Sequence, residues 1–348
     1  MRAARCHRHG PPSVVQIDHV PDPAASARQV VVDVEVASVN YPDVLLVAGG
    51  YQVPPPLPFV VGGEFAGTIS EVGANVAGFT VGDRVFGISG FGAFAERIAV
   101  DARALRHIPA GLDAASAAAF SVTYETAYHS LRSVAHVQAG ETVVVLGAAG
   151  GVGSAAVEIA VSLGARVIAA AASPERLEFC SALGAAEVVD YQREDLKARL
   201  KQLAPAGVDV VLDPVGGPYS EPAMRAMSWG SRFVVIGFAS GEIARIPLNL
   251  VLLKGVSVLG FDQRSFAVNR PDLRQRDEAE LLTLLATGRL RPRVTASFPL
   301  DRVREALQTV ADRRVLGKAV VSVAQAAGSG APAADSGVRI RERRSDER

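Results

Sequence analysis

The stretch 142–160, TVVVLGAAGGVGSAAVEIA, restricts the possible folds of this chain more than any other. A β-type run over 142–146 leads through small residues into an apolar, alanine-rich segment typical of a helix. Ala148-x-Gly150-x-x-Gly153 has the spacing of the turn that binds dinucleotides, with alanine in place of its first glycine. Such a turn alone can be an ordinary strand-to-helix connection. The strand before it and the helix after it favour a site where a pyrophosphate binds the helix N-terminus.

Strand and helix signals alternate through the middle of the chain. The candidate strands are 142–147, 166–171, 187–190, 208–213, 232–237 and 256–261. Helical patterns such as 174–183 and 196–203 separate them. This alternation predicts a doubly wound, six-stranded parallel sheet, and therefore an α/β fold. From residue 13 to about 120 the chain is instead β-rich, with short strands between Gly, Pro and Asn turns, which suggests an irregular barrel or sandwich.

Composition narrows the classes of partner and compartment. Lys+Arg and Asp+Glu number 36 each, which argues against nucleic acid or a membrane surface as a partner. No run reaches the roughly 18–20 apolar residues that span a bilayer, and the first ten residues lack the apolar core of a signal peptide. The two cysteines lie far apart, as suits a reducing compartment. We therefore expect a cytoplasmic protein.

The chain is long for one core and suits two domains. We predict a first domain over 1–121, completed by 265–323, and a nucleotide-binding domain over 122–264. Residues 324–348 combine Ala, Gly, Ser and Pro with a mixed-charge end, which predicts a disordered tail.

Further motifs resemble the zinc-free quinone oxidoreductase branch of the medium-chain dehydrogenase/reductase superfamily. They are 59–67 (FVVGGEFAG), 123–128 (TYETAY), 213–217 (DPVGG) and Gly317-Lys318, in the family's order. The resemblance covers roughly residues 10 to 323. It implies a GroES-like β-rich catalytic domain beside a Rossmann domain, and an NADPH-dependent reductase of quinones or related enones. It also implies a homodimer in which strand 256–261 pairs with its copy.

No metal is expected at the catalytic centre. Zinc members of the superfamily use Cys, His and sometimes Glu as ligands. Here 37–40 contains no thiol, and Gly62-Gly63-Glu64 stands where Gly-His-Glu is usual. A catalytic zinc needs about three protein ligands, so we interpret Glu64 as structural.

The residues after the second strand indicate which nicotinamide cofactor binds. NAD enzymes place an acid about 20 residues beyond the glycine-rich turn, but 169–173 reads AAAAS. Ser173 offers a hydroxyl and Arg176 a planar fork for a 2′-phosphate, and Tyr191 adds a second hydroxyl. This triplet resembles the NADPH pocket of quinone oxidoreductases. Two alternatives remain open: Glu175 could face the ribose, and Arg176 could be an ordinary exposed helix residue.

Two residues of the first domain are candidate catalytic groups. Without a metal, the developing oxyanion needs a hydrogen-bond donor or a proton. By resemblance Tyr51 lies at the cofactor and substrate cleft, and related enoyl-thioester reductases use a tyrosine of that loop as proton donor. Asn40 ends a strand and is expected to orient the substrate or the nicotinamide. Alternatively, Tyr51 only packs on the nicotinamide and Asn40 satisfies buried backbone groups.

The remaining predicted cofactor contacts have three sources. The turn gives Ala149, Gly150, Gly151, Val152 and Gly153, and the strand ends of the parallel sheet give Val215, Gly237, Phe238, Phe261, Asp262 and Gln263. The family resemblance adds Thr126 and Lys318. Asp262 departs from the apolar or hydroxylated residues expected there. It could favour a cationic or hydroxylated acceptor, or pair with Arg264.

Two other functions remain open. One is an enoyl-thioester (enoyl-CoA or enoyl-ACP) reductase, for which Arg289, Arg291 and Arg293 could bind the carrier's phosphate. The other is a non-enzymatic NADPH-binding protein.

Overall fold

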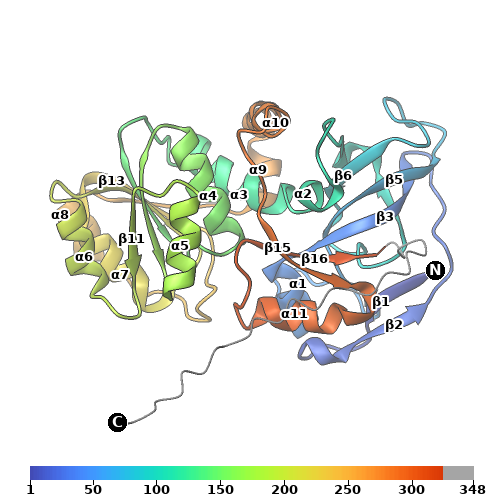
Figure 1. Cartoon of the computed structure of the whole chain (residues 1–348), viewed down its shortest axis with the longest axis horizontal. Helices are drawn as coiled ribbons and strands as arrows, with labels where there is room; N and C mark the ends of the chain where they lie inside the picture. The colour runs from blue at the N-terminus through green and yellow to red at the C-terminus, as the bar shows by residue number, and fades with distance from the viewer. Residues whose placement is uncertain (324–348) are drawn as a thin grey trace, which may run out of the picture.

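A computed structural model describes residues 1–323, which form two lobes linked by helical segments (Figure 1). The predicted disordered tail, 324–348, lies outside the described residues. The predicted domain boundaries at residues 121 and 264 stay predictions. Among the described residues, no helix has both the length and the apolar character needed to cross a membrane.

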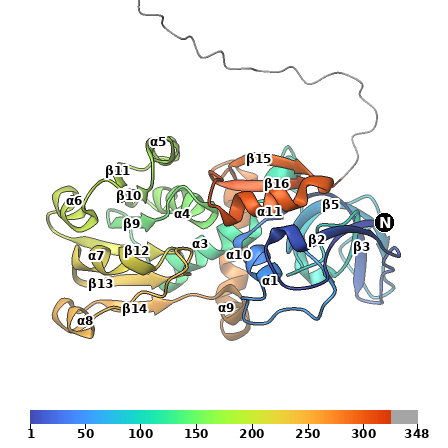
Figure 2. The same ribbon diagram turned by 90° about the horizontal axis from the view of Figure 1, so that it is seen from below.

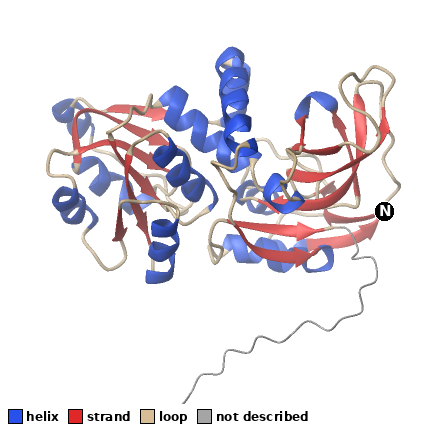
Figure 3. Cartoon of the chain, turned by 45° about the horizontal axis from the view of Figure 1, so that its top comes forward, coloured by secondary structure: helices blue, strands red, loops and turns tan. Residues whose placement is uncertain are grey.

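One lobe is a parallel sheet with helices on both faces (Figure 3). Its strand order is β11-β10-β9-β12-β13-β14. The strands are β9 (Thr142–Leu146), β10 (Arg166–Ala171), β11 (Glu187–Asp190), β12 (Val208–Asp213), β13 (Met227–Val235) and β14 (Ser257–Gly260). The helices are α4 (Gly151–Ser162), α5 (Pro174–Ala182), α6 (Leu196–Leu203), α7 (Ser220–Arg225) and α8 (Leu248–Lys254). The predicted doubly wound sheet is confirmed, and its order reverses between β9 and β12, where such sheets bind ligands.

The other lobe is β-rich. Its larger sheet has the order β15-β16-β3-β5-β6-β8, with β7 also paired to β3, and its smaller sheet has the order β2-β1-β4. The strands are β1 (Arg2–Cys6), β2 (Val15–His19), β3 (Gln29–Val39), β4 (Phe59–Val60), β5 (Glu64–Val72), β6 (Arg84–Ile88), β7 (Arg97–Asp101), β8 (Leu105–His107), β15 (Val294–Pro299) and β16 (Lys318–Ser322). Because β16 pairs antiparallel with β3, the end of the described chain returns to the lobe where the chain began.

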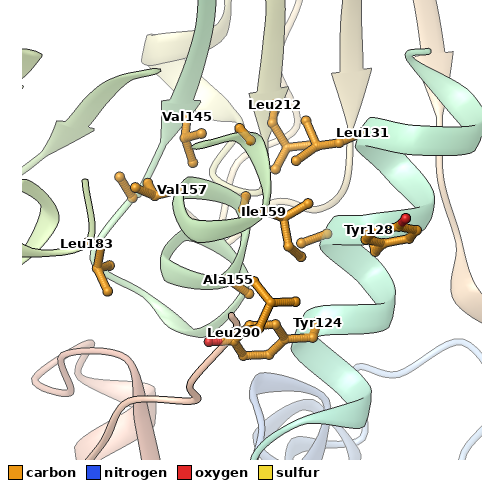
Figure 4. Close-up of a cluster of buried hydrophobic side chains, with 14 of the residues drawn as sticks. Tyr124, Tyr128, Leu131, Val145, Ala155, Val157, Ile159, Leu183, Leu212 and Leu290 are labelled. Carbon is orange, nitrogen blue, oxygen red and sulfur yellow. The ribbon is translucent and has the colours of Figure 1, made fainter. Parts of the chain in front are cut away.

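Helices join the lobes. Residues 121–134 form a run of helical turns that includes α3 (Thr126–Tyr128), and α10 (Pro271–Ala286) packs beside it between the lobes (Figure 2). Tyr124, Tyr128 and Leu131 of this run pack with Ala155 and Ile159 of α4 in one buried cluster (Figure 4). The shorter helices are α1 (Tyr41–Ala48), α2 (Ala114–Ala118), α9 (Gln263–Asn269) and α11 (Val303–Ala311).

Candidate active site

The glycine-rich turn connects β9 to α4 in the geometry that a dinucleotide turn requires. Gly147 has φ +59°, so it supplies the left-handed conformation and Ala148 can occupy the place of the usual first glycine. A Cβ at Gly153 would lie 2.2 Å from the Gly147 carbonyl oxygen, so only glycine permits this close packing of helix and strand. Gly150 precedes α4 and no side chain caps the helix. The first-turn N–H groups are therefore available to a pyrophosphate.

Ser173, Arg176 and Tyr191 lie around the carboxyl ends of β10 and β11. Ser173 precedes α5 with φ +100°, and Arg176 is in the first turn of that helix. The Arg176 guanidinium donates a hydrogen bond to the carbonyl oxygen of Arg313. Burial raises the pKa of Tyr191 to about 12, while the charges of Arg176 and Arg313 act to lower it. A second arginine thus stands beside the predicted triplet, which sequence reasoning missed because 137 residues separate Arg313 from Arg176. Glu175 is exposed at the start of α5.

Asn40 lies in a buried polar cluster, which we define as Asn40, Asp43, Glu64 and Lys318. These side chains are between 1% and 6% exposed. Asn40 Nδ2 donates to Glu64 Oε2 (3.0 Å), and Lys318 Nζ donates to Asn40 Oδ1 (2.5 Å) and Glu64 Oε2 (3.4 Å). Asp43 Oδ2 accepts the Asn40 backbone N–H (2.7 Å) at the start of α1. The Asn40 side chain therefore has two charged partners, and it also takes part in the capping box at the start of α1.

Tyr51 lies on the loop that follows α1 and is 36% exposed. Burial raises the pKa of its phenol, and the negative charge of Asp262 adds to that effect while Arg264 opposes it. Tyr51 therefore lies within electrostatic range of the start of α9 and keeps its proton at neutral pH. A protonated phenol can donate a hydrogen bond to an acceptor in the cleft.

The carboxyl edge of the sheet holds Val215, Gly237 and Phe238, whereas Thr126 lies in α3 of the helical run between the lobes. Val215 lies against Gly147 of the turn, and Phe238 lies against Gly216. The Thr126 hydroxyl is buried and donates to the Val122 carbonyl (2.6 Å). Gly237 precedes Phe238 at the end of β13.

The segment after β14 uses its side chains to anchor α9. Phe261 packs near His129, with 6.0 Å between ring centroids. Asp262 Oδ1 accepts the Ser265 N–H (2.7 Å) and caps α9; no ion pair joins Asp262 to Arg264 within residues 1–323. Gln263 Nε2 donates to Glu125 Oε2 (2.7 Å). Helix capping is thus a role for Asp262 that neither sequence alternative contained.

The three arginines considered as a phosphate-binding patch lie beside α4, although the side chain of Arg291 donates to the Gly288 carbonyl (3.2 Å) and not to the helix. The Arg291 backbone N–H lies 3.4 Å from Glu158 Oε2, and Arg293 Nε lies 3.9 Å from Glu158 Oε1. Arg289 reaches the Ser162 carbonyl at 3.5 Å. These contacts favour a structural role for the segment.

Glu64 occupies the place predicted for it as a structural residue. Its Oε1 accepts the Val122 N–H (2.8 Å), which ties β5 to the helical run between the lobes. In the part of the chain that the structure covers, no three or more His, Cys, Asp or Glu side chains gather as a metal site would need.

A β-rich lobe packed against a doubly wound sheet, with a glycine-rich turn facing the lobe junction, defines a two-domain nucleotide-dependent dehydrogenase. Comparison with known families agrees: residues 26–110 match the alcohol dehydrogenase GroES-like domain, and residues 151–286 match the zinc-binding dehydrogenase family.

Individual relatives narrow this class. The chain is 37% identical over 328 residues to a quinone oxidoreductase-like protein 2 homolog of Nematostella vectensis, covering 93% of this chain and 89% of the relative. A Thermus thermophilus quinone oxidoreductase, also solved with NADPH, has a TM-score of 0.82 and 34% identity, covering 93% and 100% of the two chains. The Escherichia coli quinone oxidoreductase complexed with NADPH has a TM-score of 0.86 and 27% identity, with the same coverage. The chain belongs to the quinone oxidoreductase branch of the medium-chain dehydrogenase/reductase superfamily, and is an enzyme of that type.

Proposed function

We propose that this chain reduces quinones or related electrophilic enones with NADPH and without a metal. The observation that carries the proposal is Arg176 beside Tyr191, with the charge of Arg313 also acting on that phenol, near the strand end where an NAD enzyme places an acid. Two guanidinium groups suit the charge of a 2′-phosphate. Relatives solved with NADPH support the same choice.

The residues present fit that cofactor along the crevice. The uncapped N-terminus of α4 would hold the pyrophosphate, and Arg176, Arg313, Ser173 and Tyr191 would hold the 2′-phosphate. NADPH supplies a hydride. Together with one proton, that hydride converts a quinone to a hydroquinone. The chain must therefore align the acceptor, exclude water and deliver the proton.

Tyr51 is proposed as the donor of that proton or of a hydrogen bond to the acceptor oxygen. Its raised pKa keeps the phenol protonated, and the charges of Asp262 and Arg264 at the start of α9 act on it. Tyr51→Phe is expected to lower kcat about 100-fold, as for loss of a general acid, with the Kd for NADPH unchanged. Stopped-flow reduction of a quinone and NADPH titration of the same preparation would measure the two quantities. An unchanged kcat would mean that Tyr51 only packs on the nicotinamide.

The alternatives have weaker support. An enoyl-thioester reductase needs a cationic group for the carrier phosphate. Of the three arginines considered for it, Arg289 and Arg293 direct their side chains to α4, and the side chain of Arg291 donates to the Gly288 carbonyl in its own turn. A purely non-enzymatic role does not suit a member of an enzyme family. We propose that the substrate is a small molecule. The equal numbers of acidic and basic residues give no reason to propose binding to nucleic acid or to a membrane.

A homodimer is proposed through β14, the edge strand of the parallel sheet. Val258 on this strand is 49% exposed, and Trp229, Leu252 and Leu253 expose more than two-thirds of their surface. Unpaired strand edges with apolar neighbours invite pairing with another chain. Light scattering of the purified protein at micromolar concentration should give the dimer mass, and Val258→Asp should give the monomer. A wild-type monomer would contradict the proposal.

A further inference from the structure

Lys318 is a buried lysine that contacts both the polar cluster of the β-rich lobe and the glycine-rich turn of the parallel-sheet lobe. It begins β16 and is 4% exposed, although lysine is rarely buried without a partner. Its ammonium donates to Asn40 Oδ1 at 2.5 Å and to Glu64 Oε2 at 3.4 Å. The charge is thus directed into the β-rich lobe rather than toward the glycine-rich turn.

The two charged neighbours fix the amide of Asn40 in one orientation. A carboxylate only accepts hydrogen bonds and an ammonium only donates them. Nδ2 must therefore face Glu64, at 3.0 Å, and Oδ1 must face Lys318. Glu64 accepts a hydrogen bond from one of the two N–H groups of Asn40 Nδ2. Because the amide is planar and fixed, the direction of the other N–H group is also fixed.

The stem of Lys318 contacts the cofactor side. A Cβ at Gly151 would lie 3.2 Å from Lys318 Cδ and 3.1 Å from a methyl group of Thr123, so both side chains pack under the first turn of α4. The Gly317 N–H donates to the Ala149 carbonyl at 2.8 Å. The segment Gly317-Lys318 therefore contacts both the glycine-rich turn and the side chain of Asn40.

The charges in the cluster make the lysine hard to replace. Asp43 and Glu64 are both buried. Within residues 1–323, Lys318 is the only cation ion-paired with Glu64 (3.4 Å), and its charge also acts on Asp43. Burial raises the pKa of Asp43 to about 7, and the charge of Lys318 opposes that rise. Without the ammonium, Glu64 would be a buried carboxylate with no compensating charge, which is strongly unfavourable.

We propose that Lys318 is a positioning residue that holds Asn40 in register with the glycine-rich turn, so that acceptor and nicotinamide meet in one geometry. The proposal rests on the proposed function for its kinetic readout. In this proposal the ammonium of Lys318 binds Asn40 and Glu64. The phosphates of the cofactor bind the N-terminus of α4 and the guanidinium groups of Arg176 and Arg313.

Kinetics of Lys318→Met, which keeps length but removes charge, test this role. We expect kcat for quinone reduction to fall about 10- to 100-fold, the loss typical of a small misplacement of reacting groups. The Kd for NADPH should change less than about threefold. Lys318→Arg should recover part of kcat because it can donate to both acceptors. Lys197→Met, at an exposed position of α6, is the matched control.

Three results would overturn the role. They are a kcat within about threefold of wild type, a Kd for NADPH that rises in parallel with the loss of kcat, and no recovery in Lys318→Arg. If Lys318→Met does not fold, Glu64→Gln combined with Lys318→Met removes both buried charges. Its kcat should stay low, and full recovery would contradict the proposal.

A second readout separates this inference from the proposed function. If wild type reduces no acceptor, the proposed function fails, and the emission of bound NADPH then decides about Lys318. Lys318→Met should bind NADPH with weaker nicotinamide emission, because the ring is less firmly held. Identical emission from wild type and variant would reject the positioning role.

Discussion

Arg176→Ala is expected to raise the KM for NADPH about 10- to 100-fold and to leave the KM for NADH nearly unchanged. A charge-assisted hydrogen bond contributes about 1.5–3 kcal/mol, and 1.4 kcal/mol corresponds to a factor of ten. Only NADPH carries the phosphate that the Arg176 and Arg313 pair would bind. Initial rates with both cofactors at saturating quinone measure the change.

Glu175→Ala is the neighbouring control for this prediction. Glu175 is exposed one residue before Arg176, and its removal should leave the preference for NADPH intact. If Glu175 instead faces the ribose, its removal would weaken NADH binding. An equal rise of the KM for NADPH and the KM for NADH in Arg176→Ala would show that Arg176 stabilises α5 and does not bind the 2′-phosphate.

Gly153→Ala and Gly150→Ala are expected to separate packing from cofactor binding within one turn. A Cβ at position 153 would lie 2.2 Å from the Gly147 carbonyl oxygen. Overpacking of this kind costs about 3 kcal/mol, which lowers Tm by about 4 °C in a chain of 348 residues. A Cβ at position 150 would lie 3.4 Å from the Gly147 carbonyl oxygen, and φ there is −82°, which alanine adopts readily. Gly150→Ala should therefore keep the wild-type Tm.

Gly150→Ala should nevertheless weaken NADPH binding about tenfold, because the second glycine lets the backbone approach the pyrophosphate. Thermal unfolding without cofactor and NADPH titration of both variants provide the two measurements. A large loss of stability in Gly150→Ala, or none in Gly153→Ala, would mean that the turn packs differently.

Buried parallel strands were the most predictable elements. The predicted spans 166–171, 187–190 and 208–213 coincide with β10, β11 and β12, because strands covered on both faces read as short apolar runs with clear ends. β13 begins at Met227 rather than at the predicted 232. Pairing with β12 is irregular over 228–231, where Gly230 and polar residues hide the strand from a hydrophobic pattern.

Short elements outside the parallel sheet were missed. β1 (Arg2–Cys6) carries two arginines and resembles a charged leader more than a strand. α9 is only seven residues long and is specified by the Asp262 cap rather than by an apolar period. Both depend on contacts with distant segments.

In the candidate site, too, local features were predictable from the sequence and contacts between distant residues were not. The glycine-rich turn is local, so its spacing and the strand and helix patterns on either side were enough to predict it. The contact of Arg176 with Arg313 spans 137 residues and that of Lys318 with Asn40 spans 278, and no local pattern reports either. Resemblance to a family pointed to Lys318, and the end of a predicted strand pointed to Asn40, while the structure showed that their side chains are hydrogen-bonded.

The most direct test of the central claim is the rate of oxidation of reduced nicotinamide by wild-type protein. The acceptors are benzoquinone, phenanthrenequinone, an alkenal and crotonyl-CoA, each with NADPH and with NADH. The account predicts turnover of the quinones, faster with NADPH than with NADH. Turnover of crotonyl-CoA alone, or tight NADPH binding with no turnover of any acceptor, would contradict it.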